Sequence, residues 1–229
     1  MCGRYTLSAS RAAIVEGFRI VVRPEMIRPR FNIAPSQPVA VVVHPERGER
    51  HLDYFLWGLI PFWAKDARIG NKLINARCET AAAKPAFRAA MKHRRCLVLA
   101  DGFYEWGAPD GQKRPYLFRM ASGKPFGMAG LWEVWHDPTG AEVHTCAILT
   151  TEANEVVRPV HARMPVVVPQ GAHERWLDPR QRSPAELSDL LAASPPGEMT
   201  CWAVSEMVNS PANDEPACIV PLSRPETSA

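Results

Sequence analysis

Proline is the feature that most constrains how this chain can fold. The sequence has 22 prolines in 229 residues, nearly one in ten. Proline lacks a backbone N–H and has a fixed φ, so it interrupts helices and is excluded from the interior of most sheets. The apolar runs between the prolines are short, and those at residues 39–43 and 96–100 have the length of single strands. We therefore expect many loops and short strands.

Composition narrows the class of protein further. Hydrophobic residues make up 46% of the chain and charged residues 22%, which excludes wholesale disorder, a collagen-like fibre and a coiled coil. No apolar run approaches the ~18 residues of a membrane span, and the N-terminus lacks a secretory signal. The six cysteines are scattered without a C-x-x-C pair, which fits neither a disulfide framework nor a zinc site. We expect a reduced cytoplasmic protein without membrane segment, metal or cofactor.

The apolar and aromatic pattern predicts one α+β domain over residues 1–221 and a short tail at 222–229. Its centre is expected to be a mixed, mainly antiparallel, barrel-like β-sheet with a few peripheral helices. Strands are predicted at 4–7, 39–43, 52–57, 96–100, 104–106, 116–120, 126–135, 143–150, 164–168 and 201–205. Helices are predicted from Ser8 or Ser10 to about residue 18, at 79–93, at 171–177 and at 184–192. In the segment 79–93, Pro85 must either lie in the first turn or divide the helix. Residues 24–38 are predicted to be a loop.

The net charge of +3 is too small to indicate a class of binding partner, but the charged residues are unevenly distributed along the chain. Residues 84–95 contain six basic or histidine side chains and no acidic one. This segment fits either a surface that faces phosphates or the solvated face of a helix.

Cys2 can become the N-terminal residue, because the initiator methionine is commonly removed before a small residue. An N-terminal α-amine has a pKa near 7.7–8.0, against about 10.4 for lysine, so much more of it is the neutral nucleophile at neutral pH. Such an amine attacks aldehydes to form a Schiff base, and the neighbouring thiol then closes a thiazolidine ring. The alternative is an accidental, partly buried thiol without a function.

Three further clusters of polar side chains lie in apolar or aromatic surroundings. Asn75 and Arg77 are two residues apart, so in a strand both face the same side. Glu105 lies among aromatic residues, which can raise the pKa of a carboxyl group towards neutrality and suit it to acid–base catalysis. His161 is expected in a turn before a strand. Each also has a structural interpretation, respectively as a turn cap, a surface ion pair and a hydrogen-bonded loop histidine.

Taken together, six ordered motifs resemble one known family. They are Met1-Cys-Gly-Arg-Tyr, Asn32-Ile-Ala-Pro35, Trp57-Gly-Leu-Ile-Pro-x-Trp63, Ile74-Asn-Ala-Arg-x-Glu-Thr80, Ala100-Asp-Gly-Phe-Tyr-Glu-Trp106 and His161-x-Arg-Met-Pro165. In this order they resemble the SOS response-associated peptidase (SRAP) domain proteins. The resemblance runs from Cys2 to about Pro221, which is nearly the whole chain.

This resemblance implies a sensor and shield of abasic sites in single-stranded DNA during the DNA damage (SOS) response. Cys2 is expected to become N-terminal through loss of Met1, in a step described as autoproteolytic, and to capture the deoxyribose aldehyde as a thiazolidine crosslink. By motif, Asn75 would orient the Cys2 adduct and Glu105 would act as general acid and base. His161 would assist Schiff-base capture and any β-elimination (AP-lyase) cleavage of the strand.

The resemblance also implies a set of DNA contacts. Arg4, Arg77 and Arg163 would hold phosphates, which positions a strand without reading its sequence. Asn32, Pro35, Trp63 and Trp106 would line the DNA groove, where aromatic rings stack on or wedge between bases. The expected partner is abasic single-stranded DNA, and the expected protein is a cytoplasmic monomer that associates with the nucleoid when DNA is damaged.

Cys78 is a departure from the common pattern, because a small or polar residue is usual there. Strand alternation predicts that it faces away from Asn75 and Arg77. Two other functions remain open at the level of sequence. One is a cysteine peptidase that acts on other proteins, with Cys2 as nucleophile, and the other is a single-strand binding module without catalysis.

Overall fold

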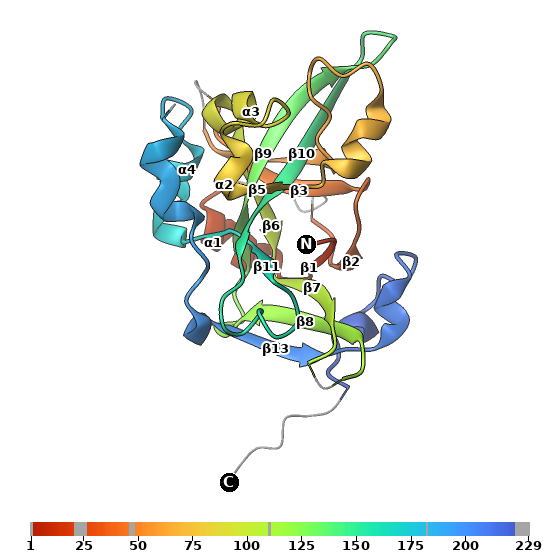
Figure 1. Ribbon diagram of the computed structural model, residues 1–229. Helices are drawn as coiled ribbons and strands as arrows, with labels where there is room; N and C mark the ends of the chain where they lie inside the picture. Colours follow the sequence, from red (N-terminus) through yellow and green to blue (C-terminus); the bar gives the residue numbers. More distant parts are fainter. Residues whose placement is uncertain (1, 21–26, 46–48, 110, 182, 223–229) are drawn as a thin grey trace.

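The computed structural model describes residues 2–20, 27–45, 49–109, 111–181 and 183–222. Two β-sheets lie one beside the other, and short helices cover their outer edges (Figure 1). Among the described residues, no helix combines the length and the apolar character needed to cross a membrane.

The first sheet contains a closed five-stranded barrel. Its strands are β3 (Pro38–Val43), β4 (His51–Trp57), β6 (Arg95–Ala100), β9 (Phe126–His136) and β10 (Glu142–Glu152). They pair in the order β10-β4-β3-β6-β9, and a further pairing of β9 with β10 closes the ring. Only the β4–β10 pair is parallel in this ring. The predicted α+β domain with a mixed, mainly antiparallel, barrel-like sheet is therefore confirmed.

Three short strands extend the barrel, and one of them carries a candidate site residue. They are β5 (Asn75–Arg77), β11 (Arg163–Pro165) and β12 (Val167–Val168). The strand β5 pairs parallel to β10, with Asn75 opposite Ile148, while β11 pairs with the end of β10. Both strands are therefore fixed to β10, the strand that pairs with more partners than any other in the sheet.

The second sheet has five antiparallel strands in the order β13-β8-β7-β1-β2. Their bounds are β1 (Arg4–Leu7), β2 (Arg30–Ile33), β7 (Gly102–Gly107), β8 (Arg114–Met120) and β13 (Met199–Ala203). The strands β7 and β8, which correspond to the strands predicted at 104–106 and 116–120, pair as a hairpin, although residue 110 of its turn lies outside the described residues. The expectation of a loop over 24–38 is wrong for Arg30–Ile33, because Asp214 and β1 hold this segment as a strand.

The helices are short. Ser10 caps α1 (Arg11–Phe18) by accepting a hydrogen bond from the Ala13 N–H. The helix predicted at 79–93 is divided at Pro85, which was one of the two alternatives. The chain forms α2 (Cys78–Ala81) and α3 (Arg88–His93), because Pro85 interrupts the helical hydrogen bonds between them. The last α-helix is α4 (His173–Leu177). The 3₁₀-helices are η2 (Ala67–Lys72), η3 (Gln170–Ala172), η4 (Pro184–Leu191), η5 (Pro196–Glu198), η6 (Glu206–Asn209) and η7 (Pro216–Ile219).

The basic segment at 84–95 is partly structural. Arg95 is buried, and its guanidinium donates to the backbone oxygens of Met91 and Trp176, among others. Arg94 forms an ion pair with Glu133. Because the guanidinium groups of these two arginines are engaged by other groups of the protein, the segment is not a uniform phosphate-facing surface.

The described chain ends in contact with the second sheet. The Leu222 N–H donates to the Ala203 oxygen, and Pro221 forms an isolated bridge with Val204. The rest of the predicted tail, residues 223–229, lies outside the described residues.

Candidate active site

Four elements that are far apart in sequence converge near Cys2. Cys2 comes just before β1, Asn75 begins β5, Glu105 lies on β7 and His161 precedes β11. Figure 1 places the N-terminal end of the chain between the barrel and the second sheet, beside β1. The site is therefore built where the two sheets meet.

Asn75 holds the backbone of Cys2. Its Nδ2 donates a hydrogen bond of 2.7 Å to the Cys2 carbonyl oxygen, while its buried Oδ1 accepts none from the described residues. The Cys2 side chain is fully buried, with its Sγ 3.8 Å from the Arg4 carbonyl oxygen. Asn75 thus fixes Cys2 and keeps one acceptor available beside it.

Glu105 and His161 form the acid–base part of the site. Glu105 is 4% exposed, and its Oε1 lies 3.9 Å from His161 Nδ1. Burial raises the pKa of Glu105, while the positive charges of the chain's N-terminus and of His161 oppose the increase. Burial also raises the pKa of the Cys2 thiol, and the nearby negative charge of Glu105 adds to this effect. The sulfur is therefore held as a thiol beside a carboxyl group that can change its protonation state.

The orientation of the His161 ring follows from backbone contacts. The Arg163 N–H lies 3.0 Å from His161 Nδ1. The Arg163 carbonyl oxygen lies at the same distance of 3.0 Å from Nδ1, so this nitrogen can accept from the N–H or donate to the oxygen, depending on the tautomer. These two contacts with the Arg163 backbone hold the orientation of the ring beside Glu105.

Gly107 allows the turn that carries His161 to approach β7 closely. A Cβ atom at Gly107 would lie 2.5 Å from the Val160 oxygen and 2.8 Å from its Cα. Both are backbone atoms, so a side chain here would displace the turn. The close packing of residues 107 and 160 therefore helps to set the distance between His161 and Glu105.

Three of the residues expected to contact DNA, Arg4 at a phosphate and Asn32 and Trp106 in the groove, also hold another segment of the protein. Arg4 donates to Asn32 Oδ1 and to the backbone oxygens of Val208 and Asn209. Asn32 is fully buried, and its Nδ2 donates to the backbone oxygens of residues 208, 210 and 213. Trp106 donates from Nε1 to Asn209 Oδ1. Asn32 therefore has no exposed surface for a direct contact with DNA. Its side-chain amide positions the loop beside Arg4.

Glu79, which the sequence analysis did not single out, contacts one of the expected site residues. It forms a two-pronged ion pair with Arg163, with oxygen–nitrogen distances of 2.6 and 2.9 Å. Arg163 also donates to the Thr150 oxygen, so the start of β11 is tied to both α2 and β10. Glu79 lies in the same sequence motif as Asn75, which could have drawn attention to it. Its pairing with Arg163 could not be read from the sequence, because the two residues are 84 positions apart.

The remaining predicted side chains differ in exposure. Arg77 is exposed and Pro35 is half-buried. Within the aromatic segment at 57–63, Trp57 is buried and donates to the Ile74 oxygen, whereas Trp63 is 49% exposed. Within this segment, Trp57 therefore belongs to the core and Trp63 lies on the surface.

Cys78 does not point at Cys2. It begins α2 rather than continuing the strand, and its Sγ lies 3.9 Å from the Leu191 oxygen. In the part of the chain that the structure describes, no group of three or more histidine, cysteine or acidic side chains is arranged to hold a metal ion.

Comparison with known proteins places the chain in a family. The sequence model of "SOS response associated peptidase (SRAP)" matches residues 1–211. The abasic site processing protein YoqW of Bacillus subtilis is 41% identical over 96% of this chain and 99% of its own, and YedK of Escherichia coli is 32% identical over 97% and 100%. A crystal structure from Bacteroides thetaiotaomicron superposes with a TM-score of 0.84 at 26% identity, over 96% of this chain and 99% of that one. The chain belongs to the SRAP family.

Proposed function

We propose that this protein traps abasic sites in single-stranded DNA by forming a covalent thiazolidine through Cys2. The observation that carries the proposal is the convergence of Asn75, Glu105 and His161 on Cys2. The names of the relatives, abasic site processing proteins, agree with this substrate. Loss of Met1 is the required first step, because it converts the amide nitrogen of Cys2 into an amine.

The capture then proceeds in two bond-forming steps. The Cys2 amine attacks the aldehyde carbon of the ring-opened sugar, and loss of water gives an imine. The Cys2 thiol adds to the imine carbon, so a C–S bond forms while the thiol proton passes, through a base, to the nitrogen. No oxidant or reductant is needed, because the C=N bond becomes a C–N bond as the C–S bond and the N–H bond form.

Glu105 is suited to move these protons. The raised pKa of the Cys2 thiol means that a base must remove its proton as the sulfur attacks. The Glu105 carboxyl group, whose own pKa is raised by burial, can accept that proton and return one to the departing hydroxyl group. His161 is proposed to lie beside the sugar and its 3′ phosphate, where it would assist Schiff-base capture and a β-elimination that cleaves the strand.

The DNA strand is proposed to lie across the exposed Arg77 and Trp63, near Pro35. Arg77 would hold a phosphate and Trp63 would stack on a base. Arg4 and Trp106 would complete this surface, with Asn32 acting behind them through the loop that it holds. We further propose a monomeric protein that acts in the cytoplasm and at the nucleoid.

Intact mass spectrometry, with and without an abasic single-stranded oligonucleotide, tests the proposal. We expect loss of the Met1 mass and then a covalent adduct that forms without borohydride. An adduct that appears only after reduction would indicate a transient Schiff-base lyase instead. Absence of any adduct on protein that has lost Met1 would favour the peptidase, with Cys2 as nucleophile towards other proteins.

The ion pair of Glu79 and Arg163 gives a prediction for reversible DNA binding. Glu79→Gln removes a negative charge that neutralises Arg163, while Arg163 stays anchored by the Thr150 oxygen. We expect a severalfold higher affinity for single-stranded DNA at low salt and a log–log salt slope steeper by about 0.7. Glu142→Gln, on the distant hairpin of β9 and β10, is the matched control and should change neither. Weaker binding by Glu79→Gln would mean that the carboxylate supports Arg163 rather than competing with DNA.

Gly107 gives a prediction for the rate of capture. Gly107→Ala should move the turn at Val160 and lengthen the distance between His161 and Glu105. We expect crosslinking to slow by about tenfold, since small displacements of catalytic groups have large effects on rates. The control is Gly111→Ala, because Gly111 has no atoms near a new Cβ, although its positive φ costs some stability. Equal rates for Gly107→Ala and wild type would contradict a positioning role for this contact.

A further inference from the structure

A cavity of about 530 Å³ lies outside the candidate active site. Its walls come from α1, the turn between β8 and β9, β12, α4 and residues 189–198. None of the residues that line it belongs to the site around Cys2. Its volume falls within the ~300–1,000 Å³ that is usual for ligand pockets. The cavity is therefore large enough to bind something, and the mechanism proposed above does not use it.

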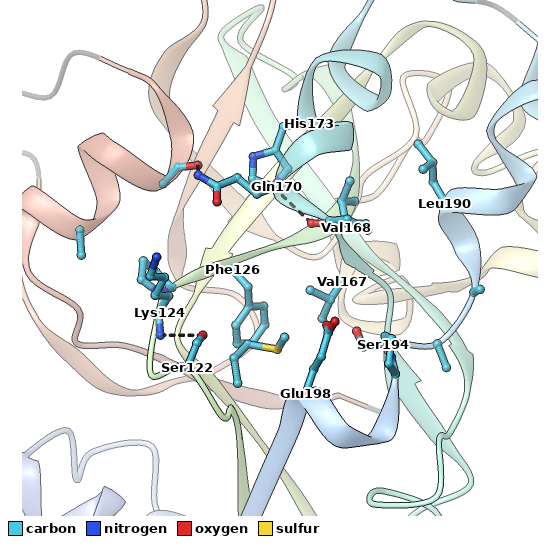
Figure 2. A pocket seen from close by; sticks show the side chains of 18 of the residues that line it. Ser122, Lys124, Phe126, Val167, Val168, Gln170, His173, Leu190, Ser194 and Glu198 are labelled. Atoms are coloured by element: carbon cyan, nitrogen blue, oxygen red, sulfur yellow. Dashed lines mark hydrogen bonds between the residues drawn. The ribbon is translucent and has the colours of Figure 1, made fainter.

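The floor of the cavity is apolar and firmly packed. Phe126, Val167 and Leu190 are 6–8% exposed and present their side chains to the cavity from β9, β12 and η4. Figure 2 shows Phe126 and Val167 at the centre of the floor and Leu190 at one side. Because these three side chains are held by different elements of the core, the floor is preformed and suits a large apolar side chain.

Two polar side chains on the floor offer directed hydrogen bonds. His173 is 4% exposed, and its Nε2 donates to the Val168 oxygen at 3.2 Å, which leaves Nδ1 as an acceptor (Figure 2). Burial lowers the pKa of His173 to about 4, so the ring is neutral at physiological pH. Ser194 is 8% exposed, and within the described residues no hydrogen bond engages its hydroxyl group. The N–H groups of a peptide can donate to His173 Nδ1, and its C=O groups can accept from the Ser194 hydroxyl group.

The charges at the rim favour a basic partner. In the described structure, no ion pair or hydrogen bond engages the carboxylates of Glu16 and Glu198 or the ammonium group of Lys124. Asp189, the other acid at the rim, is neutralised by Arg175 at 2.6 Å. Two uncommitted carboxylates against one ammonium group disfavour a phosphate backbone and attract a basic side chain.

We propose that this cavity binds a short peptide segment of a partner protein in which a large apolar residue adjoins a lysine or arginine. The apolar side chain fills the space over Phe126, Val167 and Leu190. The basic side chain pairs with Glu198 or Glu16, and the peptide groups bond to Ser194 and His173. Since the cavity shares no residue with the Cys2 site, the partner binds with or without DNA.

The test uses three fluorescein-labelled eight-residue peptides and the full-length protein. The first has Phe-Leu between two lysines, the second replaces the lysines with glutamates, and the third replaces Phe-Leu with two serines. We expect saturable binding of the first peptide only, with a Kd below about 1 mM. Amide chemical shifts should change at Phe126, Val167 and Leu190 and not at Arg77.

Variants of the rim and the floor separate the two contributions. The double variant Glu16→Gln and Glu198→Gln should weaken binding of the first peptide about fivefold, and Glu142→Gln should not change it. Ala193→Phe should fill the cavity and abolish binding while the melting temperature stays near that of wild type. Each of three results would overturn the proposal. They are equal binding of the acidic peptide, binding unaffected by all these variants, and absence of binding up to 1 mM.

Discussion

Cys2→Ala is expected to abolish the borohydride-independent adduct with abasic single-stranded DNA. In variant protein whose loss of Met1 is verified by intact mass, alanine keeps the N-terminal amine and still forms an imine, but it has no thiol to close the ring. Because an imine hydrolyses and a thiazolidine persists, the variant adduct should appear in intact mass spectra only after reduction. Reversible binding of the strand, measured by fluorescence anisotropy, should stay within about twofold of wild type, since Cys2 is fully buried and offers no binding surface.

Cys78→Ala is the matched control for this experiment. The Cys78 sulfur contacts the Leu191 oxygen rather than Cys2, so this variant should give the wild-type yield of adduct. A stable adduct on Cys2→Ala at wild-type yield would contradict the proposed chemistry. Loss of the adduct in Cys78→Ala as well would show that the second thiol takes part.

Glu105→Gln is expected to slow crosslink formation on the order of 100-fold, because general acid–base catalysis contributes about that much. Glutamine keeps the shape and polarity of the side chain but cannot exchange a proton. The rate is measured under single-turnover conditions with saturating DNA, so that binding does not enter it. A rate within about a factor of two of wild type would rule out acid–base catalysis by Glu105.

The pH dependence provides a second, independent signature of Glu105. Its pKa is raised by burial, so its proton is lost at higher pH than that of an ordinary glutamate. If the carboxylate acts as the base, the rate rises with pH through this raised pKa and then levels off until other groups titrate. In Glu105→Gln this rising limb should disappear, whereas a merely structural role would lower the rate equally at every pH.

Much of the fold was predictable because its signals are local. The all-apolar run at 96–100 indicated a buried strand, and Ser10 indicated the start of a helix. The segment Arg30–Ile33 was not predictable in this way. It is a strand because Asp214, more than 180 positions later, accepts hydrogen bonds from its backbone. The helix expected at 79–93 is divided at Pro85, one of the two outcomes that the sequence left open.

The candidate site also has features that local sequence predicts and features that depend on distant contacts. By itself, the sequence determined the chemical capabilities of single residues, including a second-position cysteine and a carboxyl group among aromatic rings. Their order along the chain also determined the family. Only the tertiary structure decided which groups meet, because the β9–β10 pairing closes the barrel and β10 then carries both β5 and β11.

The tertiary structure also decided which charges are free to act. Arg77 is exposed, Arg163 is paired with Glu79, and Arg4 is occupied by backbone oxygens near residue 208, although all three are arginines in similar motifs. The cavity beneath α1 likewise has no counterpart in the sequence pattern. A sequence encodes propensity and reactivity residue by residue, whereas partners, burial and cavities depend on contacts between distant segments, which exist only once the chain has folded.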